Sequence, residues 1–287
     1  MLEIQDVTKA YGSTLAVDGV SLSLGAGVAG LIGHNGAGKT TLMQMIATLT
    51  RPTSGRILFG GTDIARSPDA IRSRLGYLPQ DFGVYPNITA LEFLQYFAAL
   101  KGVRDRARPM RLLELVNLHD HAHRSAANFS GGMRRRLGIA QALLNEPDIL
   151  IVDEPTAGLD PEERLRFRHL LGEIGLSKLV IVSTHIVSDI ENMAGHLAIM
   201  KNGRLLAYET PEAILNDARG RIWTATVDAV RYEALSARVH VLHAQRQAGG
   251  IQVRIAHPES PCDEARAVEP SLEEALMARR YALREAA

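Results

Sequence analysis

The sequence predicts an α/β protein built around a parallel β-sheet, followed by a small C-terminal α+β part. Three short apolar runs lack polar alternation, which is typical of strands buried on both faces of a parallel sheet. They occupy residues 28–32, 149–152 and 179–182. From about residue 218 polar and apolar residues alternate instead, as in half-buried strands. A chain of 287 residues can hold one large domain or two modest ones.

Composition excludes several classes of protein. The 32 Lys and Arg residues balance 32 Asp and Glu residues, so the net charge that attracts a general nucleic-acid binder to phosphate is missing, and we expect no nucleic-acid partner. A single cysteine excludes an internal disulfide. The N-terminus carries acids where a signal peptide is basic and then apolar. No apolar run approaches the roughly 20 residues of a transmembrane helix, so we expect no direct membrane insertion.

The first buried run leads into a glycine-rich segment and then a helix. The segment reads Gly33-His34-Asn35-Gly36-Ala37-Gly38-Lys39-Thr40 and fits G-x-x-x-x-G-K-[ST] in full. Such a loop wraps closely around a phosphate chain, Lys39 reaches the β- and γ-phosphates, and the Thr40 hydroxyl ligates Mg²⁺. Thr41 is assigned to the same nucleotide site. The apolar spacing of the following helix extends to Leu49 and predicts an end just before Arg51.

Residues from about 85 to 145 predict a helical subdomain inserted into the α/β core. Leu91, Leu94 and Phe97 recur at helical spacing, and no strand-like run interrupts the segment. The next buried strand ends in two acids, Asp153 and Glu154. Ligands of open α/β sheets bind at the carboxyl ends of the strands, so Asp153 is a candidate Mg²⁺ ligand and Glu154 a candidate base for an attacking water.

The segment between these features narrows the choice of family. It reads Asn128-Phe129-Ser130-Gly131-Gly132-Met133-Arg134-Arg135-Arg136. In Ser130, Gly131 and Gly132 the chain resembles the ATP-binding cassette (ABC) ATPases, whose signature is usually L-S-G-G-Q. The resemblance implies a P-loop NTPase core of ABC-ATPase type with an N-terminal antiparallel β part. It also implies a head-to-tail homodimer around two ATP, in which the signature of one subunit completes the ATP site of the other.

Further positions match that family in its order along the chain. The resemblance implies that Tyr11 stacks on adenine, that Gln80 senses Mg²⁺ and the attacking water, and that His185 contacts the γ-phosphate. Asp160 lies in the Ala157-Gly158-Leu159-Asp160 segment, which resembles the loop that crosses the dimer interface and which we call the crossing loop (residues 157–160). Two alternatives stay open: Tyr11 as a core aromatic at a strand edge, and His185 as a structural histidine.

The sequence departs from the family pattern at four positions. Met133 and Phe129 replace the Gln and Leu of the signature, Ala157 replaces the Ser of the crossing loop, and His34 replaces the common Pro or Ser of the phosphate loop. Met133 and Ala157 lose side-chain hydrogen bonds, whereas the Ser130 hydroxyl and the backbone amides that contact phosphate are kept. We expect these changes to tune the rate or the dimer affinity without abolishing activity.

Two further clusters are interpreted as solvated surface. His119, His121 and His123 alternate along the chain and do not converge on a metal ion. The basic run 134–136 is interpreted as a solvated helix face.

The C-terminal region, residues 218–287, predicts a small α+β appendage to an ATPase domain spanning residues 1–217. Strands are expected at 222–227, 239–245 and 251–255, with Gly249-Gly250 as a turn. Ser271 and Glu274 form a capping box that starts a final helix. The same segment, Pro270-Ser271-Leu272-Glu273-Glu274, resembles the P-S-L-E-[DE] ending of ATPases that serve ABC-2 type exporters.

Together these features predict an ATP-hydrolysing subunit of an ABC transporter, of ABC-2 exporter type, that uses ATP and Mg²⁺. Its expected partners are a second copy of itself and a separate transmembrane permease, whose coupling helix the family docks near residues 81–89. Its expected location is peripheral, on the cytoplasmic face of the cell membrane. One alternative is a soluble ABC ATPase acting on ribosomes or DNA, and another is a nucleotide-binding regulatory subunit with little hydrolysis.

Overall fold

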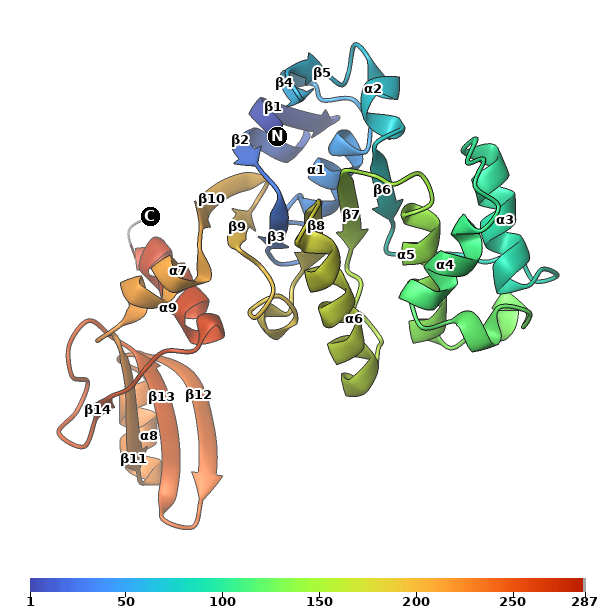
Figure 1. The fold of residues 1–287 in the computed structure, drawn as a ribbon. Coiled ribbons are helices and arrows are strands. Elements are labelled where there is room, and N and C mark those ends of the chain that lie inside the picture. The colour runs from blue at the N-terminus through green and yellow to red at the C-terminus, as the bar shows by residue number, and fades with distance from the viewer. Residues whose placement is uncertain (286–287) are drawn as a thin grey trace. The chain divides into compact units, whose positions relative to one another are not determined.

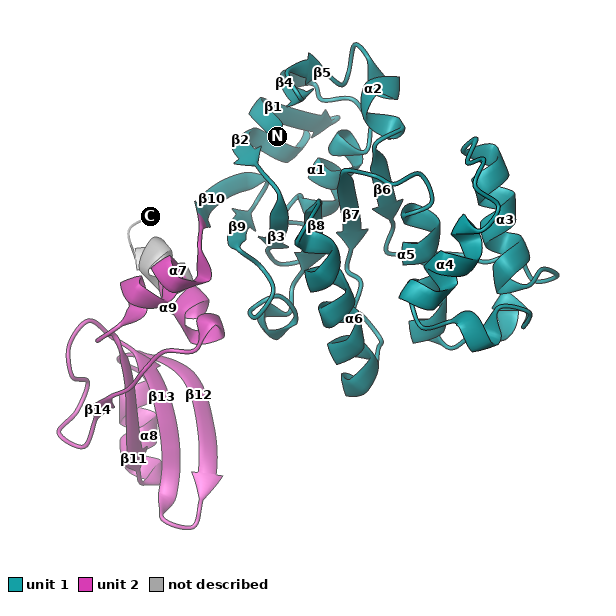
Figure 2. Ribbon diagram, viewed as in Figure 1, with its two compact units in different colours: residues 1–208 teal, residues 209–287 magenta. Residues whose placement is uncertain are grey.

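The computed structural model describes residues 1–285, with side chains described as far as residue 279. The chain forms two compact units, the first from Met1 to Tyr208 and the second beginning at Glu209 (Figure 2). This boundary comes earlier in the chain than the one predicted from the sequence, which followed residue 217. Glu209 already belongs to the second unit, where both its carboxylate oxygens accept hydrogen bonds from Arg279, at 2.8 and 2.9 Å.

The first unit is built on a six-stranded sheet with the order β10-β9-β3-β8-β7-β6 (Figure 1). Its strands are β3 (Gly27–Ile32), β6 (Leu75–Leu78), β7 (Ile149–Asp153), β8 (Leu179–Thr184), β9 (His196–Lys201) and β10 (Arg204–Glu209). The pairs from β9 through β3, β8 and β7 to β6 are all parallel. All residues of β7 and β8 are buried, which confirms the prediction of strands covered on both faces.

A second sheet of the first unit is antiparallel. It has the order β2-β1-β4-β5. Its strands are β1 (Leu2–Tyr11), β2 (Thr14–Leu24), β4 (Ser54–Phe59) and β5 (Thr62–Asp63). Together the two sheets confirm the predicted fold class, a parallel-rich α/β core with an N-terminal antiparallel β part.

Helices cover both faces of the parallel sheet. Alternate residues of a strand point to opposite faces. Leu42 and Met43 of α1 (Lys39–Ile46) join one hydrophobic cluster with Ile149 and Ile151 of β7. The helix α6 (Pro161–Gly175) contacts β3 and β8. Both sheet faces are therefore apolar, as the unbroken apolar runs require.

The helix after the phosphate loop is shorter than predicted. α1 ends at Ile46, and Leu49, which the apolar spacing assigned to it, lies beyond its end with 64% of its surface exposed. Thr48 adopts a left-handed backbone conformation, with φ of 59°, which terminates the helix. A short helix, α2 (Pro68–Arg72), and the turn η3 (Val187–Asp189) complete this part of the unit.

The predicted helical subdomain is present. Its elements are α3 (Ala90–Leu100), α4 (Arg108–Leu115), η1 (His119–His121), η2 (Ala126–Asn128) and α5 (Gly131–Ala142). A complete capping box, Thr89 with Glu92, starts α3. α5 packs against β6, so the helix that follows Ser130 is attached to the edge of the parallel sheet.

The second unit contains a four-stranded sheet with the order β12-β13-β11-β14. Its elements are α7 (Pro211–Ala218), β11 (Ile222–Val227), α8 (Ala229–Ser236), β12 (His240–Gln247), β13 (Gly250–Ala256), β14 (Arg266–Ala267) and α9 (Leu272–Glu285). The Ser271–Glu274 capping box is formed in both directions, at 2.9 and 3.2 Å. The sequence missed α8, which Asp228 caps. None of the helices within residues 1–285 has both the length and the apolar character needed to cross a bilayer.

A glycine in β6 tests the contact between the parallel sheet and α5. An added Cβ at Gly76 would lie 2.4 Å from the carbonyl oxygen of Ala142. We expect Gly76→Ala to lower the free energy of unfolding by about 1–3 kcal/mol. The control is Gly172→Ala in α6, where an added Cβ meets no atom within 4 Å and the helix gains about 0.5–1 kcal/mol. Urea unfolding of both variants measures this, and a Gly76→Ala midpoint at or above that of the control would contradict the contact.

Candidate active site

The parallel register places four loops side by side at one edge of the sheet. Ile32 of β3 pairs with Thr184 of β8, and Asp153 of β7 pairs with Ser183 of β8. Leu78 of β6 pairs with Val152, so the loop containing Gln80 continues the same row. The sequence-predicted residues on these loops are therefore neighbours because parallel strands end at the same edge of the sheet.

The phosphate loop has the glycines its backbone requires. Gly38 precedes α1 with φ of 99°, and a Cβ there would lie 2.3 Å from the carbonyl oxygen of Ala16. A Cβ at Gly33 would lie 2.6 Å from the carbonyl oxygen of Met200. The loop can therefore pass close to neighbouring backbone and leave the first turn of α1, with its unpaired N–H groups, at the sheet edge.

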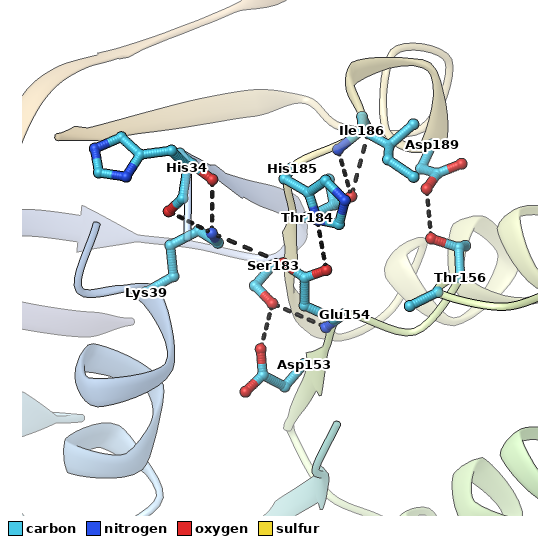
Figure 3. A network of polar contacts seen from close by, with 12 residues as sticks. His34, Lys39, Asp153, Glu154, Thr156, Ser183, Thr184, His185, Ile186 and Asp189 are labelled. Carbon is cyan, nitrogen blue, oxygen red and sulfur yellow. Dashed lines mark hydrogen bonds and ion pairs between the residues drawn. The ribbon is translucent and has the colours of Figure 1, made fainter. Parts of the chain in front are cut away.

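Lys39 is held inside this loop. Its ammonium donates to the carbonyl oxygens of Gly33 and His34, at 2.6 and 3.2 Å, and lies 3.7 Å from Oε1 of Glu154 (Figure 3). Burial lowers the pKa of Lys39, while the negative charges of Glu154 and Asp153 act in the opposite direction. The charged amine thus lies between the phosphate loop and the two acids, where it can meet a phosphate oxygen.

The two acids are joined by a serine that the sequence reasoning missed. Ser183 is fully buried, and its Oγ donates to Oδ1 of Asp153 at 2.5 Å. The same Oγ accepts the backbone N–H of Glu154 at 2.9 Å. Glu154 has a left-handed φ of 47°, and its Oε2 lies 2.7 Å from Nδ1 of His185. The sequence signal was present in the Ser183-Thr184-His185 triplet, but only the β7–β8 register shows what Ser183 contacts.

The residues assigned to Mg²⁺ provide the donors that this ion prefers. Mg²⁺ binds oxygen ligands and keeps several waters and substrate phosphates in its shell. The Ser183 bond uses one oxygen of the buried Asp153 carboxylate, and a carboxylate has two. Thr40 and Gln80 add a hydroxyl and an amide oxygen from the loops after β3 and β6. The oxygen donors in this row therefore fit the ion.

The histidine cluster 119–123 is not a metal site in the described part of the chain. Among residues 1–285 no group of three or more His, Cys, Asp or Glu side chains could hold a metal ion. Nδ1 of His119 lies 3.5 Å from Oδ1 of its neighbour Asp120, and both side chains are largely exposed. His119 and His123 are exposed, as interpreted, whereas His121 is half-buried and its ring lies edge-on to that of Phe129 with 6.4 Å between the centroids.

Tyr11 lies at the end of β1 with half of its surface exposed, so it is not a core aromatic. The ammonium of Lys9 lies 5.0 Å from the ring centroid. An exposed ring can stack on a base, and its role in binding adenine stays a prediction.

The signature residues and the crossing loop each start a helix. Ser130 is the N-cap of α5, where its Oγ accepts the N–H of Met133 at 3.2 Å. Asp160 is the N-cap of α6, where it accepts the N–H of Glu163 at 2.8 Å. Ser130, Gly131 and Asp160 are exposed, whereas Gly132 is buried against Glu163. Their predicted contact with the nucleotide of a second subunit concerns a complex and stays a prediction.

The interpretation of residues 134–136 as a solvated helix face is wrong for two of the three arginines. Arg136 is only 9% exposed; it donates to the carbonyl oxygens of Val116 and Asn117 and pairs with Glu163 at 3.3 Å. Arg135 is half-buried and donates to the carbonyl oxygen of Ala157 at 3.3 Å. The carbonyl groups that accept these hydrogen bonds are distant in the sequence, so no local sequence pattern could have predicted that the two arginines are partly or fully buried.

A groove lies between the Gln80 loop and the start of α5. Its volume is about 330 Å³. The groove is lined by Gln80, Asp81, Phe82, Gly83, Gly131, Arg134 and Arg135.

Ser183 provides a test of the acid pair. We expect Ser183→Ala to raise the Mg²⁺ concentration for half-maximal ATP hydrolysis about tenfold, because Asp153 loses the bond that orients it. ATPase rates over a Mg²⁺ titration measure this. The control is Ser236→Ala in α8, which removes a hydroxyl bonded at 3.0 Å to the carbonyl oxygen of Glu233. An unchanged Mg²⁺ dependence in Ser183→Ala would show that this bond does not position Asp153.

Comparisons with known proteins agree with this site. The family model described as ABC transporter matches residues 17–157. The Nod factor export ATP-binding protein I of Cupriavidus metallidurans is 36% identical over 225 residues, covering 77% of this chain and 74% of that protein. The bacitracin transport ATP-binding protein BcrA of Bacillus licheniformis is 37% identical over 209 residues, covering 72% and 68%.

A solved structure shares the fold as well. The dimeric, post-hydrolysis structure of an ATP-binding cassette bound to ADP and Pi has a TM-score of 0.66 and 27% identity, covering 73% of this chain and 98% of that one. With the relatives matched over more than two thirds of their length and the phosphate loop, acid pair and histidine in one row, the chain belongs to the ATP-binding, ATP-hydrolysing subunits of ABC transporters.

Proposed function

We propose that this protein is the ATPase subunit of an ABC exporter, in which two copies close around two MgATP and drive a separate transmembrane permease. The observation that carries the proposal is the row formed by Lys39, Asp153, Glu154 and His185 at the sheet edge. Export is supported by the relatives named for Nod factor export and bacitracin transport, and by the P-S-L-E-E segment at residues 270–274.

Nucleotide binding begins at the phosphate loop. The N–H groups of residues 33–41 and the start of α1 surround the phosphates, and Lys39 exchanges its carbonyl partners for phosphate oxygens. Thr40, Asp153 and Gln80 would hold Mg²⁺, which would supply charge neutralisation for the phosphates. Tyr11 packs its exposed ring on the adenine.

Hydrolysis requires a water aligned with the γ-phosphate. Glu154 accepts a hydrogen bond from this water and takes its proton as the bond to phosphorus forms. The Glu154 carboxylate accepts a hydrogen bond from Nδ1–H of His185, and a ring protonated on both nitrogens can donate its Nε2–H to a γ-phosphate oxygen. Gln80 would contact the same water and help to hold the ion. These groups stabilise the charge that develops on the phosphate oxygens during transfer.

The second copy completes the site. Ser130, Gly131 and Gly132 start α5, where the N–H groups of a helix N-terminus bind an anion. In the head-to-tail dimer they contact the γ-phosphate held by the opposite copy, and Asp160 of the crossing loop lies at the interface. A relative that is dimeric when bound to ADP and Pi supports the dimerisation.

The groove beside Gln80 provides the docking surface for the permease. Next to its Phe82, an aromatic cluster continues through Phe93 and Phe97 to the half-exposed rings of Tyr85 and Tyr96. An exposed aromatic surface rimmed by the arginines of the groove suits an amphipathic helix. Docking there would hold the subunit at the cytoplasmic face of the membrane as a peripheral protein.

The catalytic role of Glu154 has a direct test. We expect Glu154→Gln to bind ATP with wild-type affinity, to lower turnover at least 100-fold, and to form a dimer in the presence of MgATP, because the amide cannot accept the proton of the water. Phosphate release and size-exclusion chromatography measure the two effects. The matched control, Glu162→Gln, removes an exposed carboxylate paired with Arg166 and should leave both unchanged. Turnover near wild type in Glu154→Gln would refute the assignment.

The permease proposal is tested with full-length tagged protein purified from detergent-solubilised native membranes. We expect a polytopic membrane protein to copurify in near-stoichiometric amount, and Tyr85→Asp to lose it because a charge enters the aromatic surface. The control is Leu176→Asp, which changes an apolar side chain 87% exposed at the end of α6. Recovery of ribosomes in place of a membrane protein would favour the soluble alternative and overturn the proposal.

A further inference from the structure

A buried aspartate joins two loops of the active site. Asp189 ends the turn η3, which follows His185, and only 1% of its surface is exposed. Its Oδ2 accepts a hydrogen bond from Oγ1 of Thr156, which lies two residues after Glu154 (Figure 3). The loop that contains the candidate base and the turn that contains the candidate histidine are thus bonded to each other through buried side chains.

The charge of this aspartate is compensated from α6. Nε of Arg164 lies 3.6 Å from Oδ1, and neither atom has a hydrogen-bond partner within the described structure. A buried carboxylate is costly unless it is paired and hydrogen-bonded, so Arg164 and Thr156 together keep it in place. Arg168, one turn further along α6, donates to the carbonyl oxygen of Ser188 at 2.6 Å. The turn after His185 is therefore attached to α6 at two points.

These contacts matter most for the backbone conformation of Glu154. Its backbone has a left-handed φ of 47°, which a non-glycine residue keeps only when its surroundings fix it. On one side Ser183 accepts its N–H at 2.9 Å. On the other side the chain is fixed at Thr156 by Asp189. Removal of the second contact would leave Glu154 attached to β8 but let the following residues shift.

The crossing loop depends on the same contact. Its Ala157 carbonyl accepts from Arg135 of α5, and its Asp160 caps α6. Thr156 is the residue immediately before this loop, and its own carbonyl accepts the N–H of Leu159 at 3.2 Å. A change in the crossing loop would therefore reach the turn after His185 through Thr156 and Asp189.

We propose that Asp189, acting through Thr156, is a positioning residue for ATP hydrolysis: it sets the placement of Glu154 relative to His185 and links both to the crossing loop. The inference rests on the proposed roles of Glu154 and His185. Neither Asp189 nor Thr156 contacts the reacting atoms. Their effect is on the geometry of the attacking water, where a small displacement lowers the rate of the chemical step without weakening nucleotide binding.

The test uses Thr156→Val, which removes the hydroxyl and keeps the shape of the side chain. We expect kcat to fall about tenfold with KM for ATP within about twofold of wild type, because binding groups on the phosphate loop are untouched. Thr156→Ser keeps the donor and should restore kcat. The control is Thr48→Val, whose hydroxyl accepts from Nε of Arg72 at 2.8 Å outside the site. Melting temperatures are measured in parallel, and assays are run where every variant is folded.

A double-mutant cycle with Asp189→Asn separates positioning from simple loss of stability. If the two residues act together, the combined variant should have a kcat close to that of the more impaired single variant. Additive losses, or a Thr156→Val enzyme with wild-type kcat and only a lower melting temperature, would overturn the inference. Glu154→Gln distinguishes the two proposals: if it is inactive while Thr156→Val is fully active, only the positioning role fails.

Discussion

The in-register pairing of β3, β8, β7 and β6 is the constraint on which the rest of the site depends. Because Asp153 pairs with Ser183, the serine hydroxyl reaches both the Asp153 carboxylate and the Glu154 amide. A shift of one residue between β7 and β8 would reverse the side-chain directions of one strand relative to the other and separate these groups. The unbroken apolar strands and the helices on both faces hold this register, so core packing determines the active-site geometry.

The buried polar residues lie mainly at one place. Within the described residues they are Lys39, Arg136, Asp153, Glu154, Thr156, Ser183, Thr184 and Asp189. Apart from Arg136, they lie at the carboxyl edge of the parallel sheet or in the loops, helix start and turn that follow it. Burial of charge is unfavourable unless each group has partners. The site satisfies this by pairing Lys39 with Glu154 and loop carbonyls, an arrangement that phosphate oxygens can replace.

The features that the sequence predicted are those with local causes. Apolar runs, the glycine-rich loop and the Ser271–Glu274 capping box depend on residues close together in the chain, and all are present. Features that depend on distant partners were missed or misjudged. Ser183 has a role only because β7 places the Asp153 carboxylate and the Glu154 amide beside it. Arg136 can be buried because the carbonyl oxygens of Val116 and Asn117, which follow α4, accept hydrogen bonds from its guanidinium. The family resemblance predicted the roles of the site residues even though their contacts could not be predicted, because matching motif positions assign roles directly.

The crossing loop explains how an interface could control hydrolysis without supplying the base. Within one chain it is bonded to α5 through Arg135, adjoins Thr156, and starts α6 through Asp160. In the proposed dimer both the start of α5 and this loop face the second copy. Contact with the second copy would displace or fix the crossing loop. Through Thr156 this loop is connected to Glu154 and to the turn after His185. Closure of the dimer would then also align the water, because the buried contact between Thr156 and Asp189 connects the crossing loop to the residues that position this water.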